Sequence, residues 1–239
     1  MKIRNAARQA GFTLVEIAIV LVIIGLLLVG VLQGQEMIEN TKTKSVVSDM
    51  KAIQAAYNGY IDRYKNLPGD EAAATMLARG WGGAGATTGN ANGILSMAAA
   101  DTFVNAASSA TTEQRSFWRA IRGSGLLSGD VALVGTDALP RHSAGGLIGL
   151  ASGAGGVGNL IYGQSGIFVC ASGLSTKQAA AIDTIIDGPL PATNIGNSVG
   201  NLRAESGTAP LAPTSPTPAN LAYNEVTTTT PWTVCMRIG

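Results

Sequence analysis

A stretch of 19 residues without a charged side chain, from Ile17 to Gln35, constrains the fold of this chain more than any other feature. An apolar helix of about 20 residues is long enough to cross a lipid bilayer. Three basic residues, Lys2, Arg4 and Arg8, precede the stretch. By the positive-inside rule they place the N-terminal end in the cytoplasm and the rest of the chain on the outer side. An ordinary single-pass anchor would show the same features.

Glu16 is the residue that an ordinary anchor does not explain. It lies directly before the apolar stretch, and an ionisable residue inside a membrane helix costs about 3 kcal/mol and usually marks function. Gly11 also precedes the stretch, whereas a secretory signal peptide is cut after its apolar region. A cut at Gly11 would therefore leave the membrane helix on the mature chain.

The segment Gly11-Phe12-Thr13-Leu14-Val15-Glu16, behind a basic leader, resembles the N-terminus of the type IV pilin and pseudopilin family. The resemblance covers about the first quarter of the chain. It implies that a prepilin peptidase cuts between Gly11 and Phe12 and methylates the new amine of Phe12. It also implies that Thr13 and Glu16 act in assembly, with Glu16 binding the methylated amine of Phe12 in a neighbouring subunit.

Composition favours a loop-rich domain outside the cytoplasm. Without the leader, 13 basic residues face 15 acidic ones, and a net charge near −2 argues against a strongly basic nucleic-acid binder. Charged residues make up only 13% of the chain, and 31 residues are glycine. Cys170 and Cys235 suit one disulfide in an oxidising compartment, and pilins similarly pin a C-terminal segment to the sheet with a disulfide. Two buried thiols are the alternative.

The pattern of apolar residues predicts one long helix, from Phe12 to Lys65, which Leu67-Pro68-Gly69-Asp70 ends. Its second half carries an apolar face that includes Val46, Met50, Ile53 and Tyr57. We expect an α+β fold in which this helix packs on an antiparallel β-sheet, as in type IV pilins. The expected organisation is a leader at 1–11, a membrane and assembly half of the helix at 12–35, and a periplasmic or extracellular domain at 36–239.

Further elements follow from local patterns. Asp70 is a candidate N-cap for a short helix, and capping boxes are predicted at Thr111 with Gln114 and at Ser175 with Gln178. Apolar and β-branched runs predict strands at 131–134, 146–150, 159–162, 167–171, 226–230 and 232–237.

Catalytic chemistry finds little support in the sequence, and we expect no enzyme. The one histidine, His142, stands in a glycine- and serine-rich loop and is expected at the surface. No Gly-x-Ser-x-Gly, His-Glu-x-x-His or phosphate-loop motif occurs. Asp183 and Asp187 share a helix face and are weak candidates for Ca²⁺; alternatively one caps the following loop and the other faces water. No other cofactor is expected.

The resemblance implies a structural subunit of a type IV pilus or related filament. The chain would be a single-pass inner-membrane precursor and then part of a periplasmic or extracellular filament. Its partners would be the prepilin peptidase, further copies of itself or related pilins, and an inner-membrane assembly platform, with no specific nucleic acid. Two alternatives remain: a type II secretion pseudopilin, and a membrane-tethered binding (adhesin) domain that uses a pilin signal.

Overall fold

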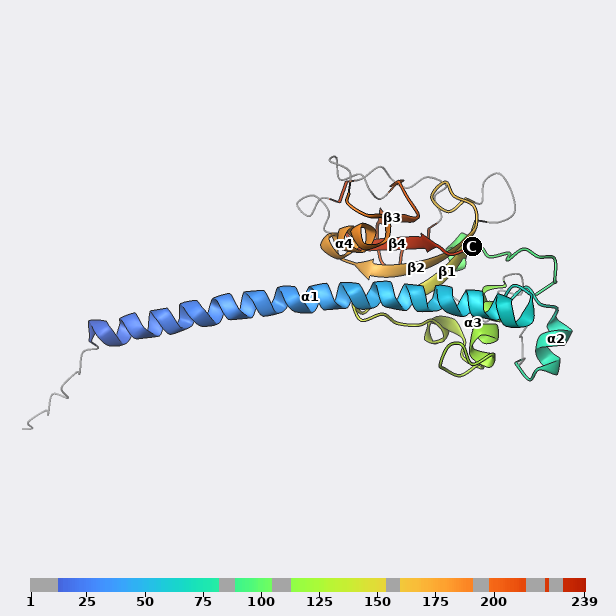
Figure 1. Cartoon of the computed structure of the whole chain (residues 1–239), viewed down its shortest axis with the longest axis horizontal. Coiled ribbons are helices and arrows are strands. Elements are labelled where there is room, and N and C mark those ends of the chain that lie inside the picture. The colour runs from blue at the N-terminus through green and yellow to red at the C-terminus, as the bar shows by residue number, and fades with distance from the viewer. Residues whose placement is uncertain are drawn as a thin grey trace, which may run out of the picture. The chain divides into compact units, whose positions relative to one another are not determined.

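The computed structural model describes residues 13–81, 89–104, 113–153, 160–190, 198–213, 222–223 and 230–239. The chain divides into two compact units, Met1–Thr41 and Lys42–Gly239. Helix α1 (Leu14–Tyr64) begins in the first unit and ends in the second (Figure 1). The predicted helix is thus present, with its end one residue before Lys65; Phe12 lies outside the described residues.

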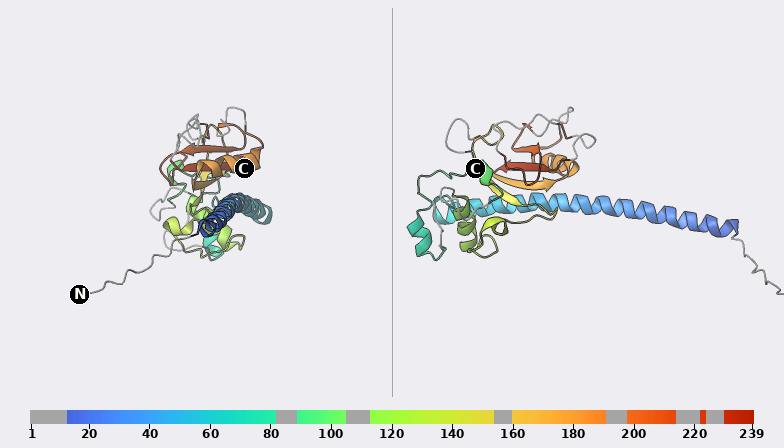
Figure 2. Two further views of the ribbon diagram at one scale, coloured as in Figure 1. Left: turned by 90° about the vertical axis from the view of Figure 1, so that its left-hand side faces the viewer. Right: turned by 180° about the vertical axis from the view of Figure 1, so that it is seen from behind.

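The part of α1 within the second unit buries one face. Its buried residues recur at steps of three and four, as the sequence pattern predicts; they are Thr43, Val46, Val47, Met50, Ile53, Ala56, Tyr57 and Tyr60. Figures 1 and 2 show the β-sheet on one side of this part of α1 and helix α3 (Gln114–Gly123) on another. A single apolar core joins side chains from all three, including Met50, Trp118 and Val169.

Four strands form one antiparallel sheet in the order β1-β2-β4-β3. They are β1 (Ile148–Ser152), β2 (Ile167–Leu174), β3 (Leu202–Ser206) and β4 (Trp232–Arg237). Every residue of β1 is buried, as are the central residues of β2 and β4. With the long N-terminal helix, this sheet gives the expected α+β fold, an arrangement consistent with a pilin-like fold.

The predicted disulfide joins the two middle strands. Cys170 of β2 stands directly opposite Cys235 of β4, and their sulfur atoms are bonded. Neither residue is exposed to solvent. The bond therefore fixes the register of the central strand pair from within the core.

Helix α4 (Thr176–Asp187) begins at the predicted capping box. The Ser175 hydroxyl accepts the Gln178 backbone N–H, and the Gln178 side chain accepts the Ser175 backbone N–H. Thr111 lies outside the described residues, but the box predicted there is wrong, because α3 begins at Gln114 with Glu113 at the N-cap and no side-chain cap. Helix α3 ends at Gly123.

The turn that follows α1 depends on a glycine. Gly69 has a φ of +94°, and a Cβ there would lie 2.7 Å from the backbone nitrogen of Phe117 in α3. Only glycine meets both conditions without strain. We predicted that Asp70 caps a short helix, but it does not cap α2 (Ala73–Ala78). Ala72 holds the N-cap position and makes no side-chain hydrogen bond there. The Asp70 carboxylate instead accepts the backbone N–H groups of Asn92 and Gly93 at 3.0 and 2.7 Å.

Three strand predictions need correction. Residues 131–134 are not a strand, because the Asp130 carboxylate accepts the Ala132 N–H at 2.8 Å and holds the chain in a turn. At 160–162, Tyr162 has a φ of +49° and the chain reverses, with Ile161 bridging to Gln164. Strand β3 was not predicted, and the first strand begins at Ile148 rather than at residue 146. Residues 226–229 of another predicted strand lie outside the described residues.

Candidate functional site

The first unit offers an apolar helical surface that no other described residue covers. The large apolar side chains from Leu14 to Leu32 are all exposed, from 47% at Ile24 to 90% at Leu14. Among the described residues, α1 is the one helix long and apolar enough to cross a membrane. Transferring each large apolar side chain out of water contributes about 1.5–3 kcal/mol. This half of α1 therefore has a strong drive to enter lipid or to pack against other apolar helices.

The start of α1 is closed by a capping box between Thr13 and Glu16. The Thr13 backbone N–H and hydroxyl both donate to Oε2 of Glu16, at 2.9 and 2.7 Å. In return, the Glu16 backbone N–H donates to the Thr13 hydroxyl oxygen at 3.3 Å. A carboxylate at this point also meets the positive end of the helix dipole.

This geometry gives Glu16 a role inside its own chain. The cap alone accounts for an acid three residues after Thr13, so the acid does not by itself require a second subunit. Both Thr13 bonds reach the same oxygen, however, and no described residue donates to Oε1. Within the described part of the chain that oxygen keeps free acceptor capacity, because a carboxylate can accept hydrogen bonds on both oxygens.

The sequence carried a signal for this cap that our sequence analysis did not use. Thr13-Leu14-Val15-Glu16 has the Thr-x-x-Glu spacing of a capping box before an apolar run. The predicted cleavage site at Gly11 and Phe12 lies outside the described residues, so its processing stays a prediction.

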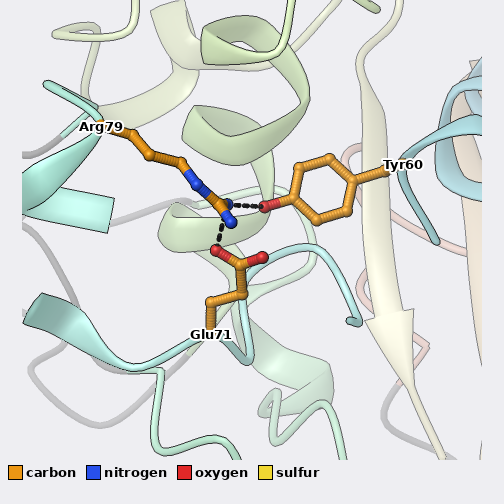
Figure 3. Close-up of polar contacts among 3 residues, drawn as sticks. All are labelled: Tyr60, Glu71 and Arg79. Atoms are coloured by element: carbon orange, nitrogen blue, oxygen red, sulfur yellow. Dashed lines mark hydrogen bonds and ion pairs between the residues drawn. The ribbon is translucent and has the colours of Figure 1, made fainter. Parts of the chain in front are cut away.

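A polar cluster connects the end of α2 to the C-terminal end of α1 (Figure 3). Arg79 donates to Tyr60 at 3.3 Å and forms an ion pair with Glu71, whose side chain is only 1% exposed. Its guanidinium also stacks 4.5 Å from the ring centre of Tyr64 and 5.1 Å from that of Trp81. The hydrogen bond that Arg79 donates to Glu71 raises the pKa of Arg79, and burial raises the pKa of Tyr60. Both groups thus keep their protons at neutral pH, and the cluster is a structural clamp.

The two weak metal candidates each bond to a protein group. Asp183 accepts the Tyr223 hydroxyl at 2.7 Å, and Asp187 accepts the backbone N–H of Leu202 at 2.7 Å. Asp187 thus caps the loop that follows α4, as one alternative predicted, but Asp183 is buried and does not face water. Burial, followed by the charge of Asp187, raises the pKa of Asp183 to about 6. Among the described residues, no three acids, histidines or cysteines gather as metal ligands.

We expected His142 at the surface, but its side chain is buried, with 3% of the residue exposed. Its ring contacts the carbonyl oxygen of Ser172 in β2 at 2.8 Å. The glycine-rich surroundings suggested an open loop, yet glycine here allows close packing. The described residues show no nucleophile paired with this imidazole.

Comparison with known proteins gives one positive finding. Residues 6–32 match the family model described as the prokaryotic N-terminal methylation motif, the type IV prepilin-like signal. The match includes Gly11, Phe12, Thr13 and Glu16 together with most of the exposed apolar helix. Neither the curated proteins nor the solved structures include a significant match to this chain.

Proposed function

We propose that this protein is a structural subunit of a type IV pilus, made as a membrane precursor and assembled through the N-terminal half of α1. One observation carries the proposal: the methylation motif at 6–32 coincides with an exposed apolar helix whose first turn holds a carboxylate with one open oxygen. Proteins with this signal are in general cut by a prepilin peptidase and assembled into filaments. The signal is typical of structural proteins, and we propose no catalytic activity and no cofactor.

The Thr13–Glu16 cap suggests how the carboxylate of Glu16 is stabilised in the membrane before assembly. A carboxylate in lipid without hydrogen bonds is very costly, and two bonds from Thr13 lower that cost. On assembly, the methylated amine of Phe12 from a neighbouring copy would bind the open Oε1. The pair would then be satisfied on both sides, as a buried charge requires.

Two finer alternatives are a type II secretion pseudopilin and a membrane-tethered adhesin. Both would use the same processing, and the first would use the same contact at Glu16. The pilus predicts long filaments outside the cell and the pseudopilin a short periplasmic assembly. A tethered adhesin predicts no filament at all. Electron microscopy of filaments sheared from the cells that make this protein separates the three.

Processing is tested by mass spectrometry of the membrane fraction. We expect a mature chain that begins with N-methylated Phe12, and a precursor that accumulates when Gly11 is replaced by Val. A mature chain with any other first residue would contradict the assignment of the cleavage site.

Assembly is tested with two substitutions that separate the cap from the charge. Glu16→Gln keeps an acceptor for Thr13, because glutamine also serves in capping boxes, but it cannot form an ion pair. Glu16→Ala removes both. We expect both variants to be processed normally and to lose filaments in cells without a wild-type copy. Normal filament yield with Glu16→Gln would show that the negative charge plays no part in subunit contact.

A further inference from the structure

The only histidine of the chain lies in a turn, residues 141–147, which a bridge between Arg141 and Leu147 closes. Nε2 of His142 lies 2.8 Å from the Ser172 carbonyl oxygen, and Nδ1 lies 3.3 Å from the backbone nitrogen of Ala144. A carbonyl oxygen can only accept, so Nε2 carries the hydrogen. The Ala144 N–H can only donate, so Nδ1 carries none. The contacts therefore require the uncharged ring in one tautomer.

The same turn holds together two elements of the second unit. Ser143 donates its hydroxyl to the carbonyl oxygen of Lys42 in α1, at 3.1 Å. Gly146 lies so close to β2 that a Cβ there would fall 1.8 Å from the Ser172 carbonyl oxygen. The turn thus contacts α1 on one side and β2 on the other.

The charged surroundings of His142 are sparse. Asp49 on α1 is the carboxylate whose charge acts on the ring, and it favours the protonated form. β2 faces the ring with the neutral Ser172, and Arg141, the neighbour in the chain, is exposed. Burial outweighs both the hydrogen bond to Ser172 and the charge of Asp49, which favour the protonated form, and lowers the pKa of His142 below its ordinary 6.5.

We propose that His142 is a proton-sensitive pin, which holds the 141–147 turn against β2 and α1 when uncharged and releases it when a proton binds at Nδ1. The added proton would face the Ala144 N–H, so that hydrogen bond must break. It would also place a positive charge in a buried position where, among the described residues, the partly exposed Asp49 supplies the opposing charge. Histidine is the side chain whose ordinary titration falls between pH 5 and 8. This role does not depend on the filament proposal.

The sign of the effect follows from proton linkage. The released turn has a histidine with an ordinary pKa, and the docked turn has a lowered one, so acid favours release. Release becomes about tenfold more favourable for each pH unit below 6.5, until the docked histidine itself titrates. Above pH 7 protonation of His142 contributes almost nothing to release.

The first test is an NMR titration of the full-length protein in detergent micelles. Because the chain has one histidine, labelled imidazole gives one set of signals that needs no assignment. We expect the ring to be the Nε2–H tautomer at pH 7.5 and to titrate below 6.5. A midpoint at or above 6.5, or the other tautomer, would overturn the proposal. So would protonation that occurs only together with unfolding of the whole second unit.

The second test measures release itself by hydrogen exchange with mass spectrometry. His142→Gln can donate to Ser172 without titrating. Wild type and variant are compared at the same pH, so intrinsic exchange rates cancel. At pH 7.5 we expect equal exchange over residues 141–147; at pH 5 the wild type should exchange at least several-fold faster. Asp49→Asn should lower the pKa of the docked histidine and make release at pH 5 at least as favourable as in wild type, because it removes a charge that stabilises the protonated docked ring. Equal exchange in wild type and His142→Gln at pH 5 would refute the pin.

Discussion

Removing the Cys170–Cys235 bond should destabilise the second unit by about 4 kcal/mol. The bond closes a loop with a sequence separation of 65 residues, which contains α4 and β3. On the chain-entropy model, a crosslink over such a loop contributes about 4 kcal/mol by restricting the unfolded chain. The loop includes a proline-rich stretch, with Pro210 and Pro213 within the described part. Stability of this size is a large part of the 5–15 kcal/mol typical of a domain.

The assay is urea unfolding of the purified protein in three forms. The oxidised wild type is compared with the reduced wild type, which keeps both sulfur atoms and lacks only the bond. The double variant Cys170→Ala and Cys235→Ala also lacks the buried sulfur atoms, so its additional loss measures packing alone. We expect the first difference to be about 4 kcal/mol, equivalent to roughly 10 °C in Tm. A first difference below 1 kcal/mol would refute the view that loop closure supports this half of the chain.

Three further predictions concern single side chains. Because the folded pKa of Asp183, about 6, lies above its ordinary 3.8, ionisation opposes folding; stability should rise by about 2 kcal/mol as the pH falls from 7 to 4. Urea titrations should show that Asp183→Asn lacks this rise, and an equal rise in the variant would exclude the effect. Gly69→Ala should lower stability by at least about 2 kcal/mol in the same assay, whereas Gly80→Ala, with a positive φ but no atom within 4 Å, should cost about 1; equal losses would argue against the contact with α3. Thr13→Val should speed amide exchange in the first turn of α1 about fivefold, because it removes a cap worth about 1 kcal/mol. Thr13→Ser should leave the exchange rate unchanged. Equal exchange rates in the two variants would show that the cap does not stabilise the helix start.

The elements that the sequence predicted well are those that carry their own periodic or local signal. Helix α1 shows an unbroken pattern over many turns, and its apolar face includes Met50 and Ile53 at helical spacing. The Ser175 capping box is complete within four residues. The disulfide followed from having only two cysteines in a chain whose N-terminal pattern led us to expect an oxidising compartment. For the helix and the capping box, the residues that determine the structure lie close together in the sequence. For the disulfide, two cysteines allow one pairing.

The elements that it predicted poorly depend on distant partners. β3 reads Leu-Arg-Ala-Glu-Ser, and only Leu202 and Ala204 are buried, so β4 rather than propensity makes it a strand. We predicted Asp70 as a helix cap, but its carboxylate accepts hydrogen bonds from two backbone N–H groups more than 20 residues away. His142 was read from its neighbours in the sequence, whereas its burial comes from β2. At the candidate site the motif was recognised, and the capping box within it was not.

The order of strands has a consequence for how the second unit can form during export. β4, the strand nearest the C-terminal end, lies between β2 and β3 in the sheet. Until Trp232–Arg237 has left the ribosome, β3 has no neighbouring strand and Cys170 has no disulfide partner. The N-terminal helix, by contrast, can enter the bilayer as soon as it is made. Each copy should therefore be anchored well before it is folded, and a chain truncated before residue 232 should remain in the membrane as substrate for proteolysis.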